Sequence, residues 1–291
     1  MANPQPSIKQ FRSYLERRNY ASHTVESYCL DLSLFFADRP RLPATITHQD
    51  VEDFVESHQV QNLAPTTINR RLHALKHFFD FLLEERQVLG NPVKSSHFAR
   101  EGRPLPRALT MAQIQALFGQ MKHPMDRSLF GLMLRCGLRV SEVVALKRRH
   151  IDWDQDALLI EQGKGRKDRR GYLCADAAEM LREALALRPK GVPGDAVFWN
   201  RKRPTVPLKD KAIQKKIERL AKAAGIEASC HSLRHTFASN LLENGAELIA
   251  IKDLLGHASV TSSQRYARLS NQKVKEEYLR TMNKVIRQNK V

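Results

Sequence analysis

The N-terminal third of the chain places apolar side chains three or four positions apart, which is the spacing of one face of an α-helix. This spacing predicts two helices near the N-terminus and another after Pro65. Between them, the segment from Thr47 to Asp50 has a capping pattern that predicts the start of one more helix. The apolar positions of the first, second and last of these helices are Ile8, Phe11, Tyr14 and Leu15; Val25, Tyr28, Leu32 and Phe35; and Ile68, Leu72, Leu75, Phe79 and Leu82. A small helical bundle is therefore expected in this part.

The rest of the chain combines helical spacing with one short region of a different kind. A second capping pattern, at Thr110 and Gln113, predicts a helix, and a further helix over residues 129–136 is expected to stop at Gly137. Residues 151–174 hold short apolar runs around a turn-rich basic segment, which is typical of a β-hairpin or a small sheet. Helical patterns return over residues 178–187, 213–224, 233–244, 249–255 and 274–286. The predicted fold class is mainly α with a small β-sheet or hairpin.

Residues 90–107 have the composition of a linker, because they are rich in proline, glycine and basic side chains and lack amphipathic spacing. We place the domain boundary there. Residues 1–92 are expected to form a helical domain, residues 93–107 the linker and residues 108–291 a second domain, a division that suits the chain length. The basic residues that favour a linker path along DNA are Lys94, Arg100, Arg103 and Arg107.

The chain is strongly basic, with a formal net charge of +17 at pH 7. Residues 1–100 hold 12 Lys and Arg against 11 Asp and Glu, whereas residues 101–291 hold 36 against 20. A protein this basic usually meets a polyanion, so nucleic acid is the expected partner of the second part. Composition alone also leaves open a ribosome-associated or generally basic protein.

No apolar run is long enough to span a membrane, and residues 1–10 lack the pattern of a signal peptide. A cytoplasmic, nucleoid-associated protein with no membrane partner is therefore expected. The cysteines are far apart and form no pair with metal-ligand spacing, so they are interpreted as buried, reduced thiols. They are Cys29, Cys136, Cys174 and Cys230.

Two short motifs in the second part place polar side chains on a common helix face. Arg139 precedes Glu142 by three residues, so the carboxylate can hold the guanidinium in one orientation. His231 and Arg234 have the same spacing, so both can converge on a single oxyanion. Taken alone, the Arg139–Glu142 spacing is more typical of a structural ion pair. The His231–Arg234 spacing alone is as typical of a capped helix with a surface arginine as of an oxyanion site.

Together with Lys164 of the predicted hairpin, a Leu-Gly-His257 motif and Tyr266 nine residues later, these motifs stand in an order that resembles the tyrosine recombinases, also called the phage integrase or Xer-like family. The resemblance covers essentially the whole chain. It implies a helical, SAM-like core-binding domain followed by a mixed α+β catalytic domain. It also implies a site-specific recombinase that cuts and rejoins DNA through a 3′-phosphotyrosine intermediate and a Holliday junction. The catalytic residues so implied are Arg139, Lys164, His231, Arg234, His257 and Tyr266, with Glu142 in support.

The resemblance further implies that four protomers act on two double-stranded DNA sites, as a homotetramer or together with a second recombinase. The C-terminal helix over residues 274–289 is expected to dock onto a neighbouring protomer; the alternative is packing on its own domain. The chain begins directly with the helical domain, which leaves no room for the arm-binding domain of large phage integrases. This favours a simple Xer-like recombinase or one carried by a mobile element.

The chemistry of phosphodiester transfer explains the arginines. Attack on phosphorus builds negative charge on the nonbridging oxygens, and guanidiniums supply planar, permanently charged donors to them. Arg139 and Arg234 are assigned to this work, with Glu142 orienting Arg139. The motifs hold no acidic pair of the kind that two-metal catalysis uses, so no metal and no other cofactor is expected.

The remaining residues are assigned to proton transfer and to attack. Tyr266 has an ordinary pKa of about 10, so as a nucleophile it needs nearby cations and a proton acceptor, for which His231 is the candidate. By the resemblance, Lys164 gives a proton to the departing 5′ oxygen. His257 is expected to donate to the scissile phosphate.

Further DNA contacts and rival functions remain open at this stage. The basic residues expected to meet DNA are Arg70, Arg71 and Lys76 in the helix over residues 66–85, and Arg166 and Lys167 beside Lys164. The alternative for residues 66–85 is an ordinary solvated helix surface. The rival functions are a type IB topoisomerase-like DNA relaxing enzyme and a DNA-binding regulator without catalysis.

Overall fold

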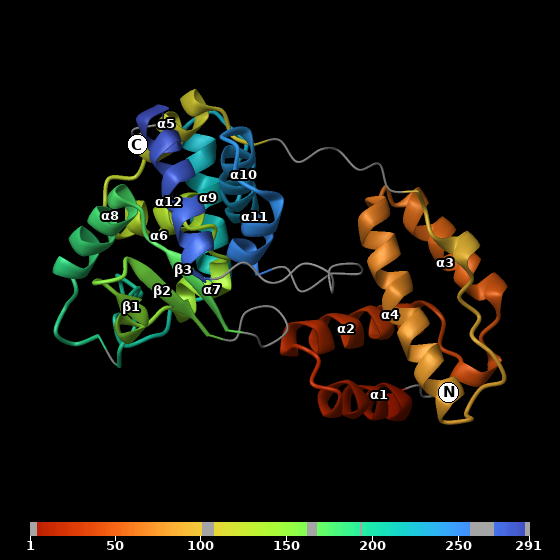
Figure 1. Ribbon diagram of the computed structural model, residues 1–291. Helices are drawn as coiled ribbons and strands as arrows, with labels where there is room; N and C mark the ends of the chain where they lie inside the picture. The colour runs from red at the N-terminus through yellow and green to blue at the C-terminus, as the bar shows by residue number, and fades with distance from the viewer. Residues whose placement is uncertain (1–4, 101–107, 162–167, 193, 257–270, 289–291) are drawn as a thin grey trace. The chain divides into compact units, whose positions relative to one another are not determined.

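The computed structural model describes residues 5–100, 108–161, 168–192, 194–256 and 271–288. The chain divides into two compact units, Met1–Pro104 and Leu105–Val291, each with its own hydrophobic core. The elements of each unit are labelled in Figure 1. Within the described residues, no helix is long and apolar enough to cross a membrane.

The first unit is the predicted helical bundle. Its helices are α1 (Gln5–Arg17), α2 (Ser22–Asp38), α3 (His48–Val60) and α4 (Pro65–Glu84). The predicted capping pattern is confirmed at the start of α3, where Thr47 accepts a hydrogen bond from the backbone of Asp50 and the Asp50 carboxylate accepts one from the backbone of Thr47. Aromatic rings fill the core, for example Phe11 and Phe78, whose ring centroids lie 5.5 Å apart.

The segment after α4 is attached to the first unit. The Asn69 side chain on α4 both donates to and accepts from the backbone of Ala99, at 2.9 and 3.0 Å. His97 is buried and pairs with Glu52 of α3 at 3.2 Å, and Val93 joins the core. Residues 93–100 therefore pack on the first unit, although the sequence analysis assigned them to the linker.

The second unit is mainly α with a small sheet, as predicted. Its helices are α5 (Met111–Gly119), α6 (Pro124–Arg135), α7 (Val140–Ala145), α8 (Ala175–Ala186), α9 (Asp210–Ala223), α10 (Cys230–Glu243), α11 (Leu248–Leu255) and α12 (Asn271–Gln288). The strands β1 (Ile151–Asp152), β2 (Ala157–Ile160) and β3 (Arg169–Tyr172) form an antiparallel sheet in the order β1-β2-β3. The predicted β region is thus confirmed. Ala157 of β2 faces Tyr172 of β3 in its register.

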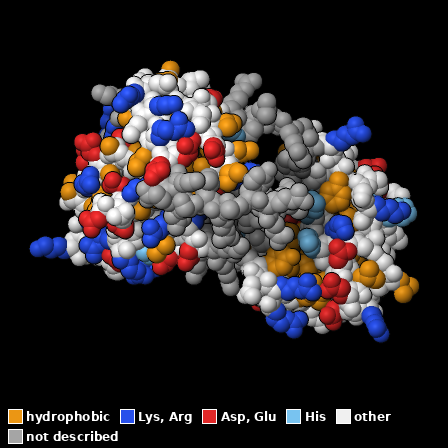
Figure 2. Space-filling model, in the orientation of Figure 1, with side chains coloured by type: hydrophobic (Ala, Val, Ile, Leu, Met, Phe, Trp, Pro, Cys, Tyr) orange, Lys and Arg blue, Asp and Glu red, His pale blue; other side chains and the backbone are white. Residues whose placement is uncertain are grey.

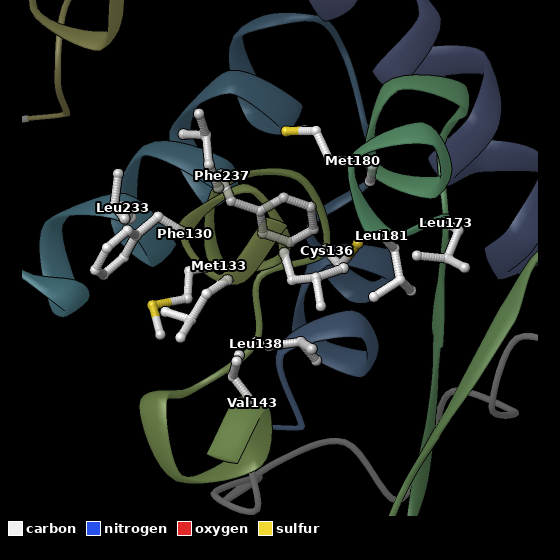
Figure 3. Packing of buried hydrophobic residues seen from close by; sticks show 14 of the residues in the cluster. Phe130, Met133, Cys136, Leu138, Val143, Leu173, Met180, Leu181, Leu233 and Phe237 are labelled. Atoms are coloured by element: carbon white, nitrogen blue, oxygen red, sulfur yellow. The ribbon is translucent and has the colours of Figure 1, made fainter. Parts of the chain in front are cut away.

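Helix α6 forms the centre of this unit, because almost all of its residues are buried. It packs against α8 and α10. Figure 3 shows its Phe130 and Met133 beside Leu233 and Phe237 of α10, with Leu138 and Val143 close by. Leu138 and Val143 are fully buried in this core, so the loop that leads into α7 and the start of α7 are fixed by its packing.

Gly137 ends α6 in a conformation that only glycine adopts readily, with a φ of +64°. A Cβ atom there would lie 2.5 Å from two ring atoms of Phe237. We expect Gly137→Ala to lower the free energy of unfolding by about 3 kcal/mol, from left-handed strain and overpacking together. Urea unfolding would measure this loss, with Gly191→Ala as the control because a Cβ at Gly191 meets nothing within 4 Å. Equal midpoints for the two variants would contradict the expected loss.

Helix α12 lies against its own unit. Its Val274, Tyr278, Met282 and Val285 are buried in the core, and it contacts α10, α11 and β3. This is the packing that the sequence allowed as the alternative to docking on a neighbour. Docking onto a second protomer stays a prediction that concerns the assembled protein.

Candidate active site

Arg139 stands at the start of α7, directly after the buried loop that follows Gly137. Its backbone N–H donates to Glu142 Oε2 at 2.7 Å, and its Nη1 donates to Glu142 Oε1 at 2.7 Å. The carboxylate therefore caps the helix and holds the guanidinium in one orientation. The contact predicted between these two side chains is present.

Glu142 is the centre of a buried ionic cluster. Only 5% of its side chain is exposed, and Arg169 Nη2 donates to its Oε2 at 2.7 Å, while Arg234 Nη1 lies 3.8 Å from the same oxygen. Burial alone would raise the pKa of Glu142, but Arg169 and the hydrogen bonds from Arg139 outweigh it and lower that pKa. One ionised carboxylate thus faces three guanidiniums, so the cluster keeps an excess of positive charge.

Arg234 comes from α10, and its guanidinium is almost completely buried. It donates to the carbonyl oxygen of Gly137 and, at 2.5 Å, to that of Leu255. Burial, followed by the positive charge of Arg139, lowers the pKa of Arg234 to about 9. The group stays protonated at neutral pH, and a phosphate would supply the negative charge that the cluster lacks.

The three arginines also meet at the C-terminal end of α11. Arg169 Nη1 donates to the Leu254 carbonyl at 2.6 Å, and Arg139 Nη2 lies 3.4 Å from the Gly256 carbonyl. With the Arg234 contact to Leu255, three consecutive carbonyls each receive a guanidinium. These carbonyls carry the partial negative charge of the helix end, so the arginines stabilise it. The point at which the chain leaves α11 is thereby fixed relative to α7, α10 and β3.

A pocket of about 370 Å³ opens beside this cluster, between α7, α9 and α10. Arg139, His231 and Arg234 all line it, and His231 is exposed. Two permanent positive charges and one imidazole therefore share a hollow of a size that admits a phosphate group. The structure brings together three of the predicted catalytic residues.

The other predicted catalytic side chains lie outside the described residues, and their roles stay predictions. They are Lys164, His257 and Tyr266, with the candidate DNA contacts Arg166 and Lys167. The described flanks of their segments lie next to the cluster. Arg169, at the start of β3, follows the segment that contains Lys164, and residues 254–256, which meet the arginines, end directly before His257.

The basic residues of α4 have acidic or histidine partners. Arg70 pairs with Asp31, which is buried on α2, and Lys76 pairs with Asp80 at 3.4 Å; both basic side chains are about half exposed. Arg71 is only 17% exposed and hydrogen-bonds His58. DNA contacts by Arg70, Arg71 and Lys76 stay predictions, with the Arg71 side chain the least exposed of the three.

Arg169 is the residue that sequence reasoning missed. It follows the basic segment of residues 164–167, which makes it look like one more DNA-facing cation. Its side chain is instead 9% exposed and turns into the cluster. A signal was present in the apolar run from Tyr172 to Cys174, which indicates that a strand rather than a loop passes close to this point.

Comparison with known proteins matches both units. The phage integrase family covers residues 107–273, and the phage integrase N-terminal SAM-like domain covers residues 8–86. Tyrosine recombinase XerC of Halalkalibacterium halodurans is 31% identical, with 93% of this chain and 95% of the relative covered. Tyrosine recombinase XerD of Lacticaseibacillus casei is 33% identical, with 94% and 97% covered.

Solved structures share the fold. The Tn1549 transposon integrase in complex with circular intermediate DNA superposes with a TM-score of 0.72 at 17% identity, over 93% of this chain and 98% of that one. A lambda integrase dimer bound to a core site gives 0.72 at 18% identity, over 92% and 98%. The chain belongs to the phage integrase family. It is a tyrosine recombinase, an enzyme that cleaves and rejoins DNA strands at specific sites, as the sequence predicted.

Proposed function

We propose that the chain exchanges strands between two double-stranded DNA sites by attack of Tyr266 on a phosphate, which leaves a 3′-phosphotyrosine and a free 5′ hydroxyl. The observation that carries this assignment is the convergence of Arg139 and Arg234 on one pocket with His231. Both guanidiniums are fixed by contacts with Glu142 and with the carbonyls at the end of α11. They therefore need no rearrangement to bind a phosphate. Preorganised donors of this kind stabilise the charge that develops during transfer.

The other roles follow from the order of groups around the phosphate. His231, exposed at the pocket, takes the proton of Tyr266, and His257 donates to a nonbridging oxygen. Lys164 gives a proton to the departing 5′ oxygen, with Arg166 and Lys167 as neighbouring DNA contacts. The phosphotyrosine bond conserves the energy of the broken phosphodiester bond. A 5′ hydroxyl of the second site can therefore attack the phosphotyrosine, form a new phosphodiester bond and release the tyrosine without ATP. The donors present account for the charge without a metal cofactor.

The assembly proposed is four protomers on two sites, joined at a Holliday junction, either as a homotetramer or with a second recombinase. A lambda integrase of the same fold, with a TM-score of 0.71 and 19% identity, is a tetramer bound to a Holliday junction. Lys and Arg side chains are spread over the visible face of the second unit, with acidic groups among them (Figure 2). The excess of Lys and Arg over Asp and Glu in the sequence of residues 101–291 suits a DNA partner, and the nucleoid of the cytoplasm is the place where such a substrate is found.

The test is a covalent adduct. The wild-type chain is incubated in EDTA with a radiolabelled DNA that carries the flanks of the protein's own gene. The DNA is nicked near the cleavage site, so that the short fragment with the free 5′ hydroxyl diffuses away after cleavage. We expect a protein–DNA band that survives denaturation, and peptide mapping that finds the DNA on the peptide containing Tyr266. Tight binding without any adduct on all flanks tried would instead favour a partner-dependent or non-catalytic protein.

A topoisomerase-like enzyme would make the same adduct, so the second readout is site dependence. Supercoiled plasmid without the recombination site is expected to stay supercoiled, whereas two sites on one plasmid are expected to yield recombinant circles. Relaxation of any plasmid, without recombinants, would identify a DNA relaxing enzyme. The recombinase assignment would then be wrong even though the tyrosine chemistry is right.

A further inference from the structure

We propose that Arg169 is a positioning residue for DNA cleavage, which holds Glu142 and the end of α11 in the arrangement that presents Arg139 and Arg234 to the pocket. The inference rests on the proposed function of those two arginines. It adds a residue with no expected contact to DNA, because Arg169 does not line the pocket and its side chain is 9% exposed.

The geometry of Arg169 is that of a bridge between two elements. Its Nη2 binds Glu142 of α7 at 2.7 Å and its Nη1 binds the Leu254 carbonyl of α11 at 2.6 Å. Arg169 itself is the first residue of β3, so three elements meet at one planar group. A guanidinium holds two acceptors at a fixed separation and angle, which a lysine ammonium on a flexible stem does not do.

Removing this bridge would release the parts that position the catalytic arginines. Glu142 Oε2 would keep the Arg139 backbone donor and the distant Arg234 guanidinium at 3.8 Å. The carboxylate is then free to turn toward Arg234. This rotation would alter the hydrogen bond that Arg139 Nη1 donates to Glu142 Oε1. At the same time the Leu254 carbonyl, next to the Leu255 carbonyl that Arg234 binds, loses its donor.

Charge alone does not explain an arginine at this position. Arg139 and Arg234 already exceed the single carboxylate of Glu142, and a third cation lowers the pKa of Arg234 further. In the absence of DNA, the three guanidiniums of the cluster repel one another. The compensating contribution of Arg169 is therefore the geometry of its two hydrogen bonds.

The packing over Gly256 provides an independent sign that Arg169 is tightly placed. Gly256 has a φ of +60°, and a Cβ built on it would lie 2.6 Å from Arg169 Cδ and 2.9 Å from Arg169 Nε. The stem of Arg169 thus lies directly on the backbone that leads to His257. Movement of this side chain and movement of that backbone are coupled.

The experiment uses the suicide DNA described above with Arg169→Met and Arg169→Lys in the full chain. The control is Arg188→Lys, because Arg188 also donates to backbone carbonyls, those of Val192, Gly194 and Ala196, but lies away from the pocket. For each variant we would measure the single-turnover cleavage rate at saturating DNA, the half-saturating DNA concentration and the melting temperature.

We expect Arg169→Met to slow cleavage at saturating DNA by about 100-fold, as a misplaced donor does, with an unchanged half-saturating concentration. Arg169→Lys recovers little of the rate, since it restores charge without the bridge. Combining Arg169→Met with Glu142→Gln should add almost nothing to the slower single variant, because both act on the same contact. The Arg188→Lys control should cleave at the wild-type rate even if it melts at a lower temperature.

Four outcomes would overturn the inference, and three of them concern the mechanism. They are full rescue by lysine, multiplicative losses in the double variant, and a higher half-saturating concentration with an unchanged rate at saturation, which would make Arg169 a DNA contact. The fourth is a cleavage rate that falls only in proportion to the folded fraction of each Arg169 variant, which would make Arg169 a stabilising residue and no more. Failure of the wild-type chain to form an adduct is different, since it would contradict the proposed function itself.

Discussion

Tyr266→Phe is expected to abolish the covalent DNA adduct and all strand exchange while DNA binding stays intact. A phenyl ring has no oxygen to attack phosphorus, so the covalent step is lost with the hydroxyl. The readout is the denaturation-resistant band on suicide DNA, together with a gel-shift measurement of binding. Loss of the band with unchanged binding separates the nucleophile from a DNA contact.

The matched control is Tyr278→Phe, in α12 of the same unit. The Tyr278 hydroxyl donates to the Arg135 carbonyl at 2.9 Å, and burial raises its pKa far above the ordinary value. Tyr172 is also buried, and its pKa is raised by that burial. Neither phenol is placed or poised for attack, so Tyr278→Phe should keep the adduct and lose about 1 kcal/mol of stability with its hydrogen bond.

An adduct that persists in Tyr266→Phe would show that another side chain is the nucleophile. Peptide mapping of that adduct would then identify the attacking group. The two tyrosine variants together test which tyrosine of the second unit forms the covalent bond with DNA.

The helices were predictable because each buries one apolar face, which places apolar residues three or four positions apart in the local sequence. The capping pattern at Thr47 shows the same locality, since it depends only on residues three positions apart. The start of α6 was placed too late, because the sequence analysis followed apolar spacing and overlooked Pro124, which begins the helix, and His123, whose side chain caps it. Boundaries depend on such caps more than on the apolar pattern.

The Arg139–Glu142 contact was also predictable from spacing, because the two residues share one helical turn. The meeting of Arg139 with Arg234 was not, since 95 positions separate them and the tertiary packing of α6 and α9 against α7 and α10 brings their elements together. Resemblance to a family supplied that link. Arg169 had no such guide, because a buried arginine after a run of basic residues has the same local signature as an exposed one.

The first unit shows the same limit for Arg70 and Arg71. The helical pattern placed both off the apolar face of α4, which predicted solvent or DNA. Their common partner is Asp31, whose side chain is 1% exposed on the neighbouring helix α2. An acidic residue one position before Leu32, within an otherwise apolar stretch, was the available sign that a cation would turn inward to meet it.

Arg234→Met is expected to slow cleavage at saturating DNA by about 100- to 1000-fold, the cost of one preorganised donor at a developing oxyanion. The variant also leaves the carbonyls of Gly137 and Leu255 without their donor, which costs about 1–3 kcal/mol of stability for each buried group left unsatisfied. Activity and stability therefore have to be separated by assaying well below the melting temperature and counting only folded protein.

Arg188→Met provides that separation, because it removes a guanidinium from three loop carbonyls without touching the pocket. It should melt earlier and still cleave at the wild-type rate. Arg234→Lys should remain slow, since a lysine keeps one charge but does not serve two carbonyls and a phosphate together. If Arg234→Met and Arg188→Met instead lose activity in the same proportion as folded protein, Arg234 only supports the loop at Gly137 and the end of α11. Arg139 would then be the guanidinium that faces the phosphate, beside His231, among the described residues of the pocket.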